Sequence, residues 1–444
     1  MVKEWRTAGL DSRPLGCQPF PMSNQPSLTL SAAVAGIALI ATAARGAIHP
    51  KEYGAKGDGI ADDSAAIQQA LDHAGATRGG IVELEAAKYR LDKPLNVPEG
   101  VTLAGVWQAP HHAQLANGTV LLIHAGKNDE NGPGAVTINA SSAVKGITFF
   151  YPEQRVPGTI PFSYTVQGKG MHGSVLDCTF VNPYQAIDFG TYANELHLIR
   201  NCFGCPLKVG VHIDKCTDIG RIENVHFNPH YWARAASEGA PDGGVLIKYL
   251  GENLVAFEFA RTDWEYVLNT FVFGAKIGYR FYSGPNGAAN GNFLGLGADW
   301  CGRAILVEQC QPPGLLITNG EFVGNDKSDI FMEIAATHDG VVQLGNCSFW
   351  GPASQIAKIA GKGSVSFSQC TFLNQGRDLA AYTIDALSGD LNLSNCRFNI
   401  AKPDIRLGKA VTTAVISGNS FNKAKRLTNE SAGDVQEGLN VVRK

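Results

Sequence analysis

The chain has 444 residues, of which 17% are charged and 51 are glycine, with a formal net charge of -3. Because charged residues are scarce, Asn, Ser, Thr, Gln and Gly must supply much of the polar surface, a balance typical of many short strands joined by tight turns. So small a net charge excludes the basic field with which proteins attract nucleic acid, and it provides no strong acidic field for a cationic partner.

The N-terminal 47 residues differ in character from the rest. Basic residues precede an apolar stretch over 28–44, which ends in Ala41-Thr42-Ala43, as at a signal peptidase site. We therefore expect residues 1–47 to be an export segment and the protein to be secreted or periplasmic; a buried N-terminal helix is the alternative. The stretch is too short and too Ala-rich for a membrane span, so no membrane association is expected after export.

A helix and the first strands are predicted next. Asp62, Asp63 and Ser64 can cap a helix. Its apolar residues recur at helical spacing and share one face: Ile67, Ala70, Leu71 and Ala74. Such a helix would cover the open end of a solenoid, as terminal repeats require. Alternating segments at 79–84, 89–91 and 101–105 are the first predicted strands.

Most of the chain beyond residue 146 repeats one short pattern. It consists of Asn, Asp or Gln, a small residue, any residue, and usually Phe. The copies begin at Asp177, Asn201, Asn224, Asn269, Asn290, Asn319, Asn346, Gln369, Asn395 and Asn419. Stacked coils bring like residues about 4.8 Å apart, so the amides would form a hydrogen-bonded ladder at one turn. The gap of 45 residues between Asn224 and Asn269 predicts an insertion in one coil.

The cysteines fit the same scheme. Five of them occupy the small position or its equivalent, and we expect these to be free thiols stacked inside the solenoid beside a stack of Phe rings: Cys178, Cys202, Cys347, Cys370 and Cys396. The other five show no metal-ligand spacing, so no metal site is expected. A disulfide between Cys205 and Cys216 remains the open alternative.

The N-terminal pattern has a counterpart among known families. The run from Tyr53 to Leu71, followed by 79–91 and 100–105, closely resembles the N-terminal signature of the pectate lyase superfamily, which includes rhamnogalacturonase-like, polygalacturonase-like and epimerase-like proteins. The resemblance implies an all-β fold, a single-stranded right-handed parallel β-helix over 48–421 with an N-terminal capping helix. The polar, unpatterned stretch 422–444 is expected to be a cap or tail.

The resemblance also implies that a sugar chain lies along the outer face of one parallel sheet. Short alternating strands are predicted at 186–189, 211–214, 245–248, 277–280, 305–308 and 330–333, with alternate residues outward. These outward residues form the first candidate site: Asp188, His212, Asp214, Lys248, Arg280, Glu308 and Glu333.

A carboxylate pair within this set suggests hydrolysis. Asp188 and Asp214 on neighbouring strands are predicted to lie roughly 7 to 8 Å apart, which suits an inverting glycoside hydrolase. His212 between them could relay a proton, and Lys248 with Arg280 could bind substrate hydroxyls or a uronate carboxylate. The alternative is that all are ordinary solvated residues. The strings that polygalacturonase-type hydrolases carry in successive coils are not reproduced; only the residue types are.

A second candidate cluster lies in predicted surface turns. Trp232, Trp264 and Trp300 are expected there, and sugar rings stack on exposed aromatic faces. The carboxylates beside this platform are then catalytic candidates: Asp263, Glu265 and Asp299. The alternative is that the Trp residues seal loops onto the solenoid wall.

These residues predict an exported enzyme that cleaves glycosidic bonds of a polysaccharide or oligosaccharide by carboxylate-pair hydrolysis, without a cofactor. Two alternatives stay open. A polysaccharide lyase would abstract a proton beside a uronate carboxylate, with Arg280 or Lys248 as base and Ca²⁺ held by Asp188 and Asp214. A non-catalytic, glycan-binding or adhesive solenoid is the other. A monomer and a homotrimer are both compatible with the sequence.

Overall fold

The computed structural model describes residues 46–107, 115, 117–235, 237, 239–325, 328–373 and 378–444, so nearly all of the predicted export segment lies outside the described residues. Ala47–Lys444 form one compact unit. Within the described ranges, no helix is both long and apolar enough to cross a membrane.

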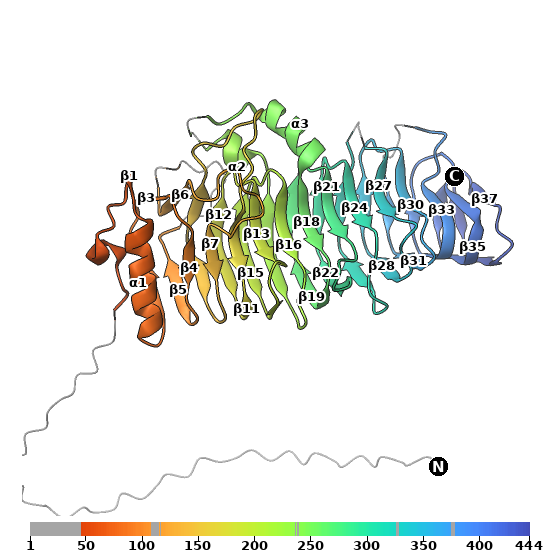
Figure 1. Cartoon of the computed structure of the whole chain (residues 1–444). Coiled ribbons are helices and arrows are strands. Elements are labelled where there is room, and N and C mark those ends of the chain that lie inside the picture. The colour runs from red at the N-terminus through yellow and green to blue at the C-terminus, as the bar shows by residue number, and fades with distance from the viewer. Residues whose placement is uncertain are drawn as a thin grey trace, which may run out of the picture. The chain divides into compact units, whose positions relative to one another are not determined.

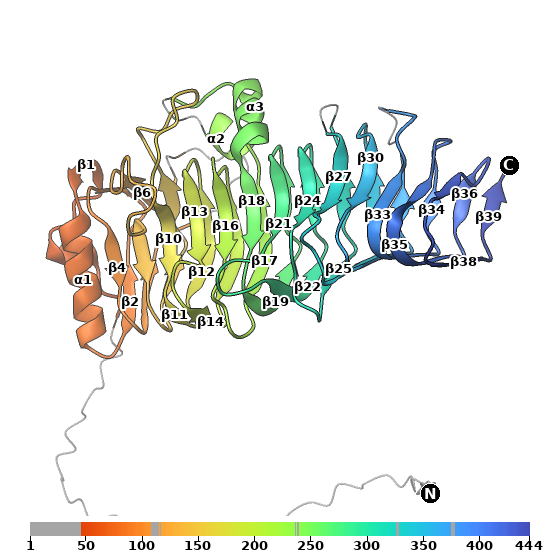
Figure 2. The same cartoon turned by 45° about the vertical axis from the view of Figure 1, so that its right-hand side comes forward.

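The described chain is a parallel β-solenoid of about 15 turns with few helices (Figures 1 and 2), which confirms the predicted fold class. Each turn contributes strands to three columns of parallel pairs, here called sheets A, B and C.

Sheet A contains β4 (Leu95–Val97), β7 (Val136–Ile138), β10 (Tyr164–Gly168), β13 (Gln185–Phe189), β16 (Val209–Ile213), β18 (Val255–Phe259), β21 (Ile277–Phe281), β24 (Arg303–Val307), β27 (Ile330–Ile334), β30 (Gln355–Ile359), the first parts of β33 (Ile384–Ser394) and β35 (Ile405–Ser417), and β37 (Leu427–Asn429). Sheet B contains β2 (Gly80–Glu83), β5 (Val101–Ala104), β8 (Ala143–Lys145), the first halves of β12 (Ser174–Phe180), β15 (Leu198–Gly204) and β17 (Arg221–Phe227), then β19 (Thr262–Leu268), β22 (Ala289–Leu294), β25 (Leu315–Thr318), β28 (Val341–Gly345), β31 (Ser364–Ser368), the second parts of β33 and β35, and β38 (Asp434–Gly438). Sheet C contains β1 (Asp58–Asp62), β3 (Lys88–Leu91), β6 (Val120–Ile123), β9 (Thr148–Phe150), the second halves of β12, β15 and β17, then β20 (Phe271–Phe273), β23 (Gly297–Asp299), β26 (Glu321–Val323), β29 (Ser348–Trp350), β32 (Thr371–Phe372), β34 (Arg397–Phe398), β36 (Ser420–Asn422) and β39 (Val441–Arg443). The short strands β11 (Gly170–Met171) and β14 (Asn194–Glu195) pair separately.

A helix covers the N-terminal end, as predicted. A 3-10 turn, η1 (Pro50–Tyr53), precedes α1 (Ser64–Ala76), and the predicted apolar face of α1 is buried: Ile67, Ala70, Leu71 and Ala74. The carboxylate of Asp63 does not cap this helix. It accepts hydrogen bonds from the backbone of Lys56 and Gly57 instead, so it shapes the preceding turn.

The asparagine ladder is present at the turn between sheets B and C. Asn201 donates to Asp177 at 2.9 Å, and Asn224 donates to Asn201 at 3.0 Å. These residues hold left-handed backbone, with φ of +54°, +54° and +52° for Asp177, Asn201 and Asn224. Asn tolerates this conformation better than most residues do, which is why amides recur there.

Two of the ten predicted ladder copies are out of register. Gly295 and Gly418, with φ of +69° and +70°, occupy the left-handed position in their coils, so Asn290 and Asn419 are not its equivalents. Glycine adopts this backbone conformation without strain, and a search for an amide therefore misses it.

The cysteine stack inside the solenoid follows the prediction, whereas the Phe stack is interrupted, because Phe203 and Phe271 are in register with Thr179 and His226 and are only partly buried. Cys178 pairs in register with Cys202, and the ring centroids of Phe322 and Phe349 lie 5.0 Å apart. All nine cysteines in the described residues are buried and free, Cys205 and Cys216 included, so these two form no disulfide.

The predicted insertion contains two helices, α2 (His230–Ala233) and α3 (Gly243–Asn253), which stand beside the solenoid in Figure 1. The prediction of a strand at 245–248 is therefore wrong. Asp242 caps α3 by accepting from two backbone N–H groups, and Leu246 and Leu250 are buried one turn apart. The strand of this coil is β18.

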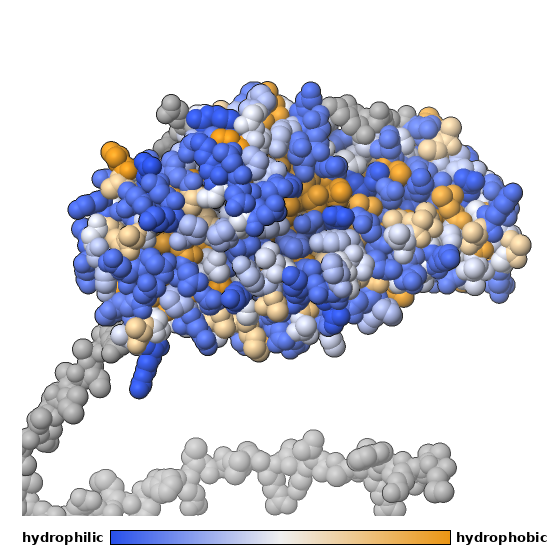
Figure 3. Space-filling view, in the orientation of Figure 1, coloured by the Kyte–Doolittle hydropathy of each residue, from blue (hydrophilic) through white to orange (hydrophobic). Residues whose placement is uncertain are grey.

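The last residues continue the solenoid. The stretch 422–444, expected to be a cap or tail, contains β37, β38 and β39, which pair with the preceding coil in all three sheets. The face shown in Figure 3 is mostly hydrophilic and is interrupted by a hydrophobic patch near its middle.

Candidate functional site

The outer face of sheet A carries a row of polar residues in register. Along it, Gln167 pairs with Asp188, Asp188 with His212, His212 with Glu258, and Glu258 with Arg280. The prediction that Asp188, His212 and Arg280 share one outward row is confirmed, and Glu333 lies further along it. Glu258 occupies the place predicted for Lys248, which lies on α3 instead.

Asp188 is fully buried although it belongs to the outward row. Its carboxylate accepts hydrogen bonds from Nδ1 of His212 at 2.8 Å, from the backbone of Gly190 at 2.9 Å and of Thr191 at 3.1 Å, and from Gln167 at 3.1 Å. Burial acts to raise the pKa of Asp188, but the hydrogen bonds from His212 and Thr191 outweigh it and hold the pKa below its ordinary value. This carboxylate is built to stay ionised.

His212 links Asp188 to a tyrosine. Its Nε2 lies 3.2 Å from the hydroxyl of Tyr282, and the ring of Tyr164 stacks on it at 6.1 Å. Burial acts to lower the pKa of His212, yet the bond to Asp188 raises it above its ordinary value. Burial also raises the pKa of Tyr282, and the charges of Glu258 and Asp214 add to this effect.

The sequence prediction missed Tyr282. It follows Arg280 by two residues, as Asp214 follows His212, so the outward alternation simply continues past the end of β21. Extending the predicted strand 277–280 by two residues would have found it.

Arg280 completes the group of side chains. Its Nε lies 2.8 Å from Oε1 of Glu308, its Nη1 lies 3.5 Å from Glu258, and its guanidinium lies 4.4 Å from the centre of the Tyr282 ring. Asp214, the other carboxylate of the predicted pair, is also buried. Its carboxylate accepts from the backbone N–H groups of Lys215 and Arg261. We call Asp188, His212, Glu258, Arg280 and Tyr282 the sheet A cluster.

Two of the three tryptophans predicted at the surface are exposed, and the third is buried. Trp264 and Trp300 are 58% and 41% exposed, as expected. Trp232 is fully buried on α2, so its expected place in a surface turn is wrong. A fully buried ring offers no face on which a sugar could stack.

The carboxylates of the second cluster do not join the first. Asp263 forms an ion pair with Arg261 and lines a hollow of about 350 Å³ with Trp264 and Leu316. Asp299 lies on sheet C, where it lines another hollow of about 480 Å³ with Trp350. Burial raises the pKa of Asp299. The two predicted clusters are therefore on different sheets and do not form one site.

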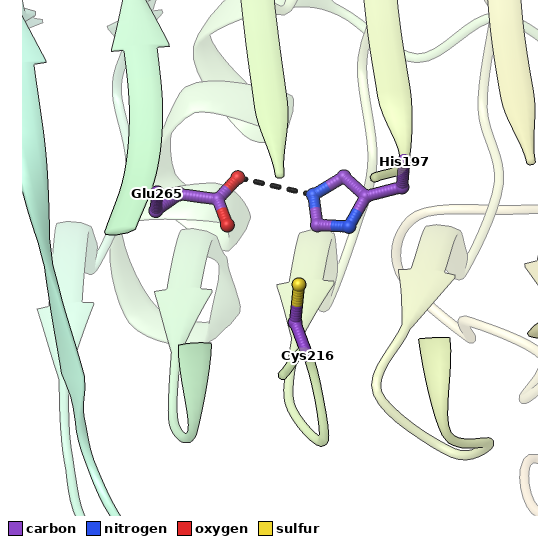
Figure 4. A group of neighbouring side chains, drawn as sticks. All are labelled: His197, Cys216 and Glu265. Atoms are coloured by element: carbon purple, nitrogen blue, oxygen red, sulfur yellow. Dashed lines mark hydrogen bonds and ion pairs between the residues drawn. The ribbon is translucent and has the colours of Figure 1, made fainter. Parts of the chain in front are cut away.

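Glu265, predicted in a surface turn, is fully buried instead, and that expectation is wrong. Its Oε1 lies 3.0 Å from Nε2 of His197, and Cys216 is the third member of the group (Figure 4). Glu265 follows the bulged start of β19, where Trp264 holds a φ of +63°, and this kink turns the carboxylate into the solenoid.

Comparison with known proteins supports the predicted resemblance. Residues 48–155 match the family described as rhamnogalacturonase A/epimerase, pectate lyase-like. Mannuronan C5-epimerase AlgE4 of Azotobacter vinelandii is 41% identical over 76 residues, which are 16% of this chain and 14% of that protein. Depolymerase 1, capsule K30/K69-specific, of Klebsiella phage K5-2 is 31% identical over 109 residues, 21% of this chain and 13% of that protein. Residues 48–155 are thus similar to pectate lyase-like proteins. The two sequence alignments span only a small part of either relative.

Among solved structures, the pre-mature bacteriophage phi29 gene product 12 has a TM-score of 0.51 at 12% identity, covering 89% of this chain and 56% of that chain. This likeness concerns the fold alone.

Proposed function

We propose that this chain is a carbohydrate-active enzyme that abstracts a proton beside the carboxylate of a uronate-containing polysaccharide, at the sheet A cluster. One observation carries the proposal: the His212 ring is bonded through Nδ1 to the buried carboxylate of Asp188 and through Nε2 to the hydroxyl of Tyr282. The matched relatives, a mannuronan C5-epimerase and a capsule-specific depolymerase, support a polysaccharide substrate.

The geometry provides a path for the proton. Because Asp188 accepts from Nδ1 of His212, the neutral ring keeps the lone pair of Nε2 directed at Tyr282. His212 takes the phenolic proton, and the phenolate of Tyr282 removes the proton from the sugar carbon. The guanidinium of Arg280 over the ring stabilises the phenolate. Reprotonation of the sugar carbanion by water from the opposite face gives epimerisation, and the hydroxide so formed takes the proton from His212. Departure of the glycosidic oxygen, which takes up the proton from His212, gives elimination instead.

The carboxylate-pair hydrolysis predicted from the sequence fits this geometry less well. Hydrolysis needs one protonated carboxyl group that faces the substrate. Asp188 is buried, and both of its oxygens accept hydrogen bonds from described residues. The same contacts leave Asp188 poorly placed to bind Ca²⁺ with Asp214, and Lys248 on α3 is not in the row that would supply the base.

The test uses the purified chain, a panel of uronate-containing and neutral polysaccharides, and D₂O as solvent. We expect either products that absorb in the ultraviolet or uptake of solvent deuterium by the sugar. Tyr282→Phe and His212→Gln should lower the rate by roughly 10²- to 10⁴-fold, the usual contribution of an acid or base. Activity should rise with pH through the raised pKa of His212, because only the neutral ring accepts a proton.

Glu333→Gln serves as the matched control, since Glu333 belongs to the same outward row but pairs with Arg303, away from His212. It should keep the wild-type rate. New reducing ends without ultraviolet absorption or deuterium uptake would identify a hydrolase and overturn the proposal. Tight binding of a glycan without any product would favour the adhesive alternative.

A further inference from the structure

A second group of titratable side chains lies inside the solenoid, apart from the sheet A cluster. His197, Cys216 and Glu265 are all fully buried, and one ligand atom of each lies within 4.8 Å of the other two. Figure 4 shows the three side chains converging from different coils. The group combines a nitrogen, a sulfur and an oxygen atom from three separate coils. Neither the asparagine ladder nor the hydrophobic stacks of the solenoid account for it.

The hydrogen bonds around His197 fix its tautomer. The amide nitrogen of Asn194 donates to the backbone carbonyls of Phe189 and Asp214, at 2.7 and 2.9 Å, so its oxygen is the atom that faces Nδ1 of His197 at 3.0 Å. Nδ1 must therefore carry a proton. Nε2 then points at Oε1 of Glu265, 3.0 Å away. Two acceptors cannot face each other at this distance unless a cation, either a proton or a metal ion, lies between them.

The space beside these atoms is kept open by a glycine. A Cβ atom on Gly220 would lie 2.2 Å from Nε2 of His197 and 2.4 Å from Oε2 of Glu265. Thr262 donates to that same Oε2 at 2.6 Å and so orients the carboxylate. A histidine held by an amide and a carboxylate held by a hydroxyl are the outer contacts that metal ligands in proteins usually have.

We propose that His197, Cys216 and Glu265 bind a Zn²⁺ ion. Imidazole nitrogen, thiolate sulfur and carboxylate oxygen are all zinc ligands, and the thiolate makes zinc a better fit than Ca²⁺ or Mg²⁺. A thiolate and a carboxylate also balance the two charges of the ion, so the buried site would be neutral overall. Since no ligand is exposed, the ion enters during folding.

The position of this site gives the ion a structural role. Backbone bridges join Asn194 to Cys216 and Cys216 to Thr262, so the three ligands come from successive coils. Phe189, next to Asp188 in the chain, stacks on the His197 ring at 4.9 Å. The ion would link three successive coils at the place where Phe189 packs on His197.

The test measures metal rather than activity. Full-length protein produced in zinc-containing medium should retain about one zinc ion per chain after dialysis. When refolded with Co²⁺ instead, it should show visible absorption bands that include thiolate charge transfer. Cys216→Ser should remove those bands, and Glu265→Gln and Gly220→Ala should lower the metal content several-fold.

Cys205→Ser is the matched control, because Cys205 is equally buried and free but is not in the cluster. It should keep the full metal content. Wild-type protein that retains no zinc and gives no cobalt spectrum after refolding with either ion would overturn the proposal, as would full zinc content in Cys216→Ser. NMR that finds both His197 ring nitrogens protonated would then identify a plain ion pair with Glu265.

Discussion

The asparagine ladder allows a quantitative test of the coil register. Replacement of Asn201 by Ala removes the bond to Asp177 and leaves Asn224 without its acceptor. The first bond is partly buried and the second is exposed, so each contributes about 0.5 to 1 kcal/mol. Ala must also hold the φ of +54°, which costs about 1 kcal/mol more than for Asn. The free energy of unfolding should therefore fall by about 2 to 3 kcal/mol.

Asn201→Gly separates the two contributions. The Gly variant loses the same hydrogen bonds but adopts the left-handed backbone without strain. The larger conformational entropy of Gly in the unfolded chain offsets about 0.5 to 1 kcal/mol of the stability gained by avoiding that strain. The Gly variant should thus be more stable than the Ala variant by up to about 0.5 kcal/mol. Urea denaturation, followed by circular dichroism and by tryptophan fluorescence, measures both and shows whether the solenoid unfolds in one step. Equal stability of wild type and both variants would refute the ladder as a source of stability.

Two further predictions concern buried side chains. Asp188→Asn should lower the pKa of His212 measured by NMR, because the burial that acts to lower it would no longer be outweighed by the carboxylate; an unchanged value would contradict the contact. Since the folded-state pKa of Asp188 is depressed, its contribution to stability is present above its ordinary pKa of 3.8 and is lost as pH falls through the depressed value, so variant and wild type should converge in acid. Trp232→Ala should lower the free energy of unfolding, measured by heat or urea, by about 3 to 5 kcal/mol. Trp264→Ala, which removes an exposed ring, should change it by no more than about 0.5 kcal/mol. Similar losses of stability in both variants would contradict the assigned burial.

Much of the fold could be predicted because the same residue pattern occurs in many coils and indicates the same turn in most of them. Eight of the ten predicted copies mark the same left-handed turn, and in each of these eight the small residue that follows the turn is buried. The row that holds Asp188, His212 and Arg280 followed from simple alternation. The prediction failed where one copy departed from the repeat: the segment 245–248 alternates like a strand, yet Asp242 and the spacing of Leu246 and Leu250 make it a helix.

Contacts between coils were harder to predict. His197, Cys216 and Glu265 are far apart in the sequence, and their approach depends on the left-handed kink at Trp264, which no pattern in the sequence announces. Tyr282 lies one step beyond the predicted strand, and its role depends on the distance to a side chain two strands away. Such contacts depend on the register of three or four coils at once, which a pattern within each coil does not specify.

The helical excursion between β17 and β18 leaves the backbone pairing on either side undisturbed. Val209 and Val255 are in register in sheet A, and the backbone N–H of Val255 donates to the carbonyl of Lys208, even though α2 and α3 intervene in the chain. A coil can therefore grow or lose such an appendage without shifting the rungs above and below it. The strand register that positions His212 therefore does not depend on the length of the segment between β17 and β18.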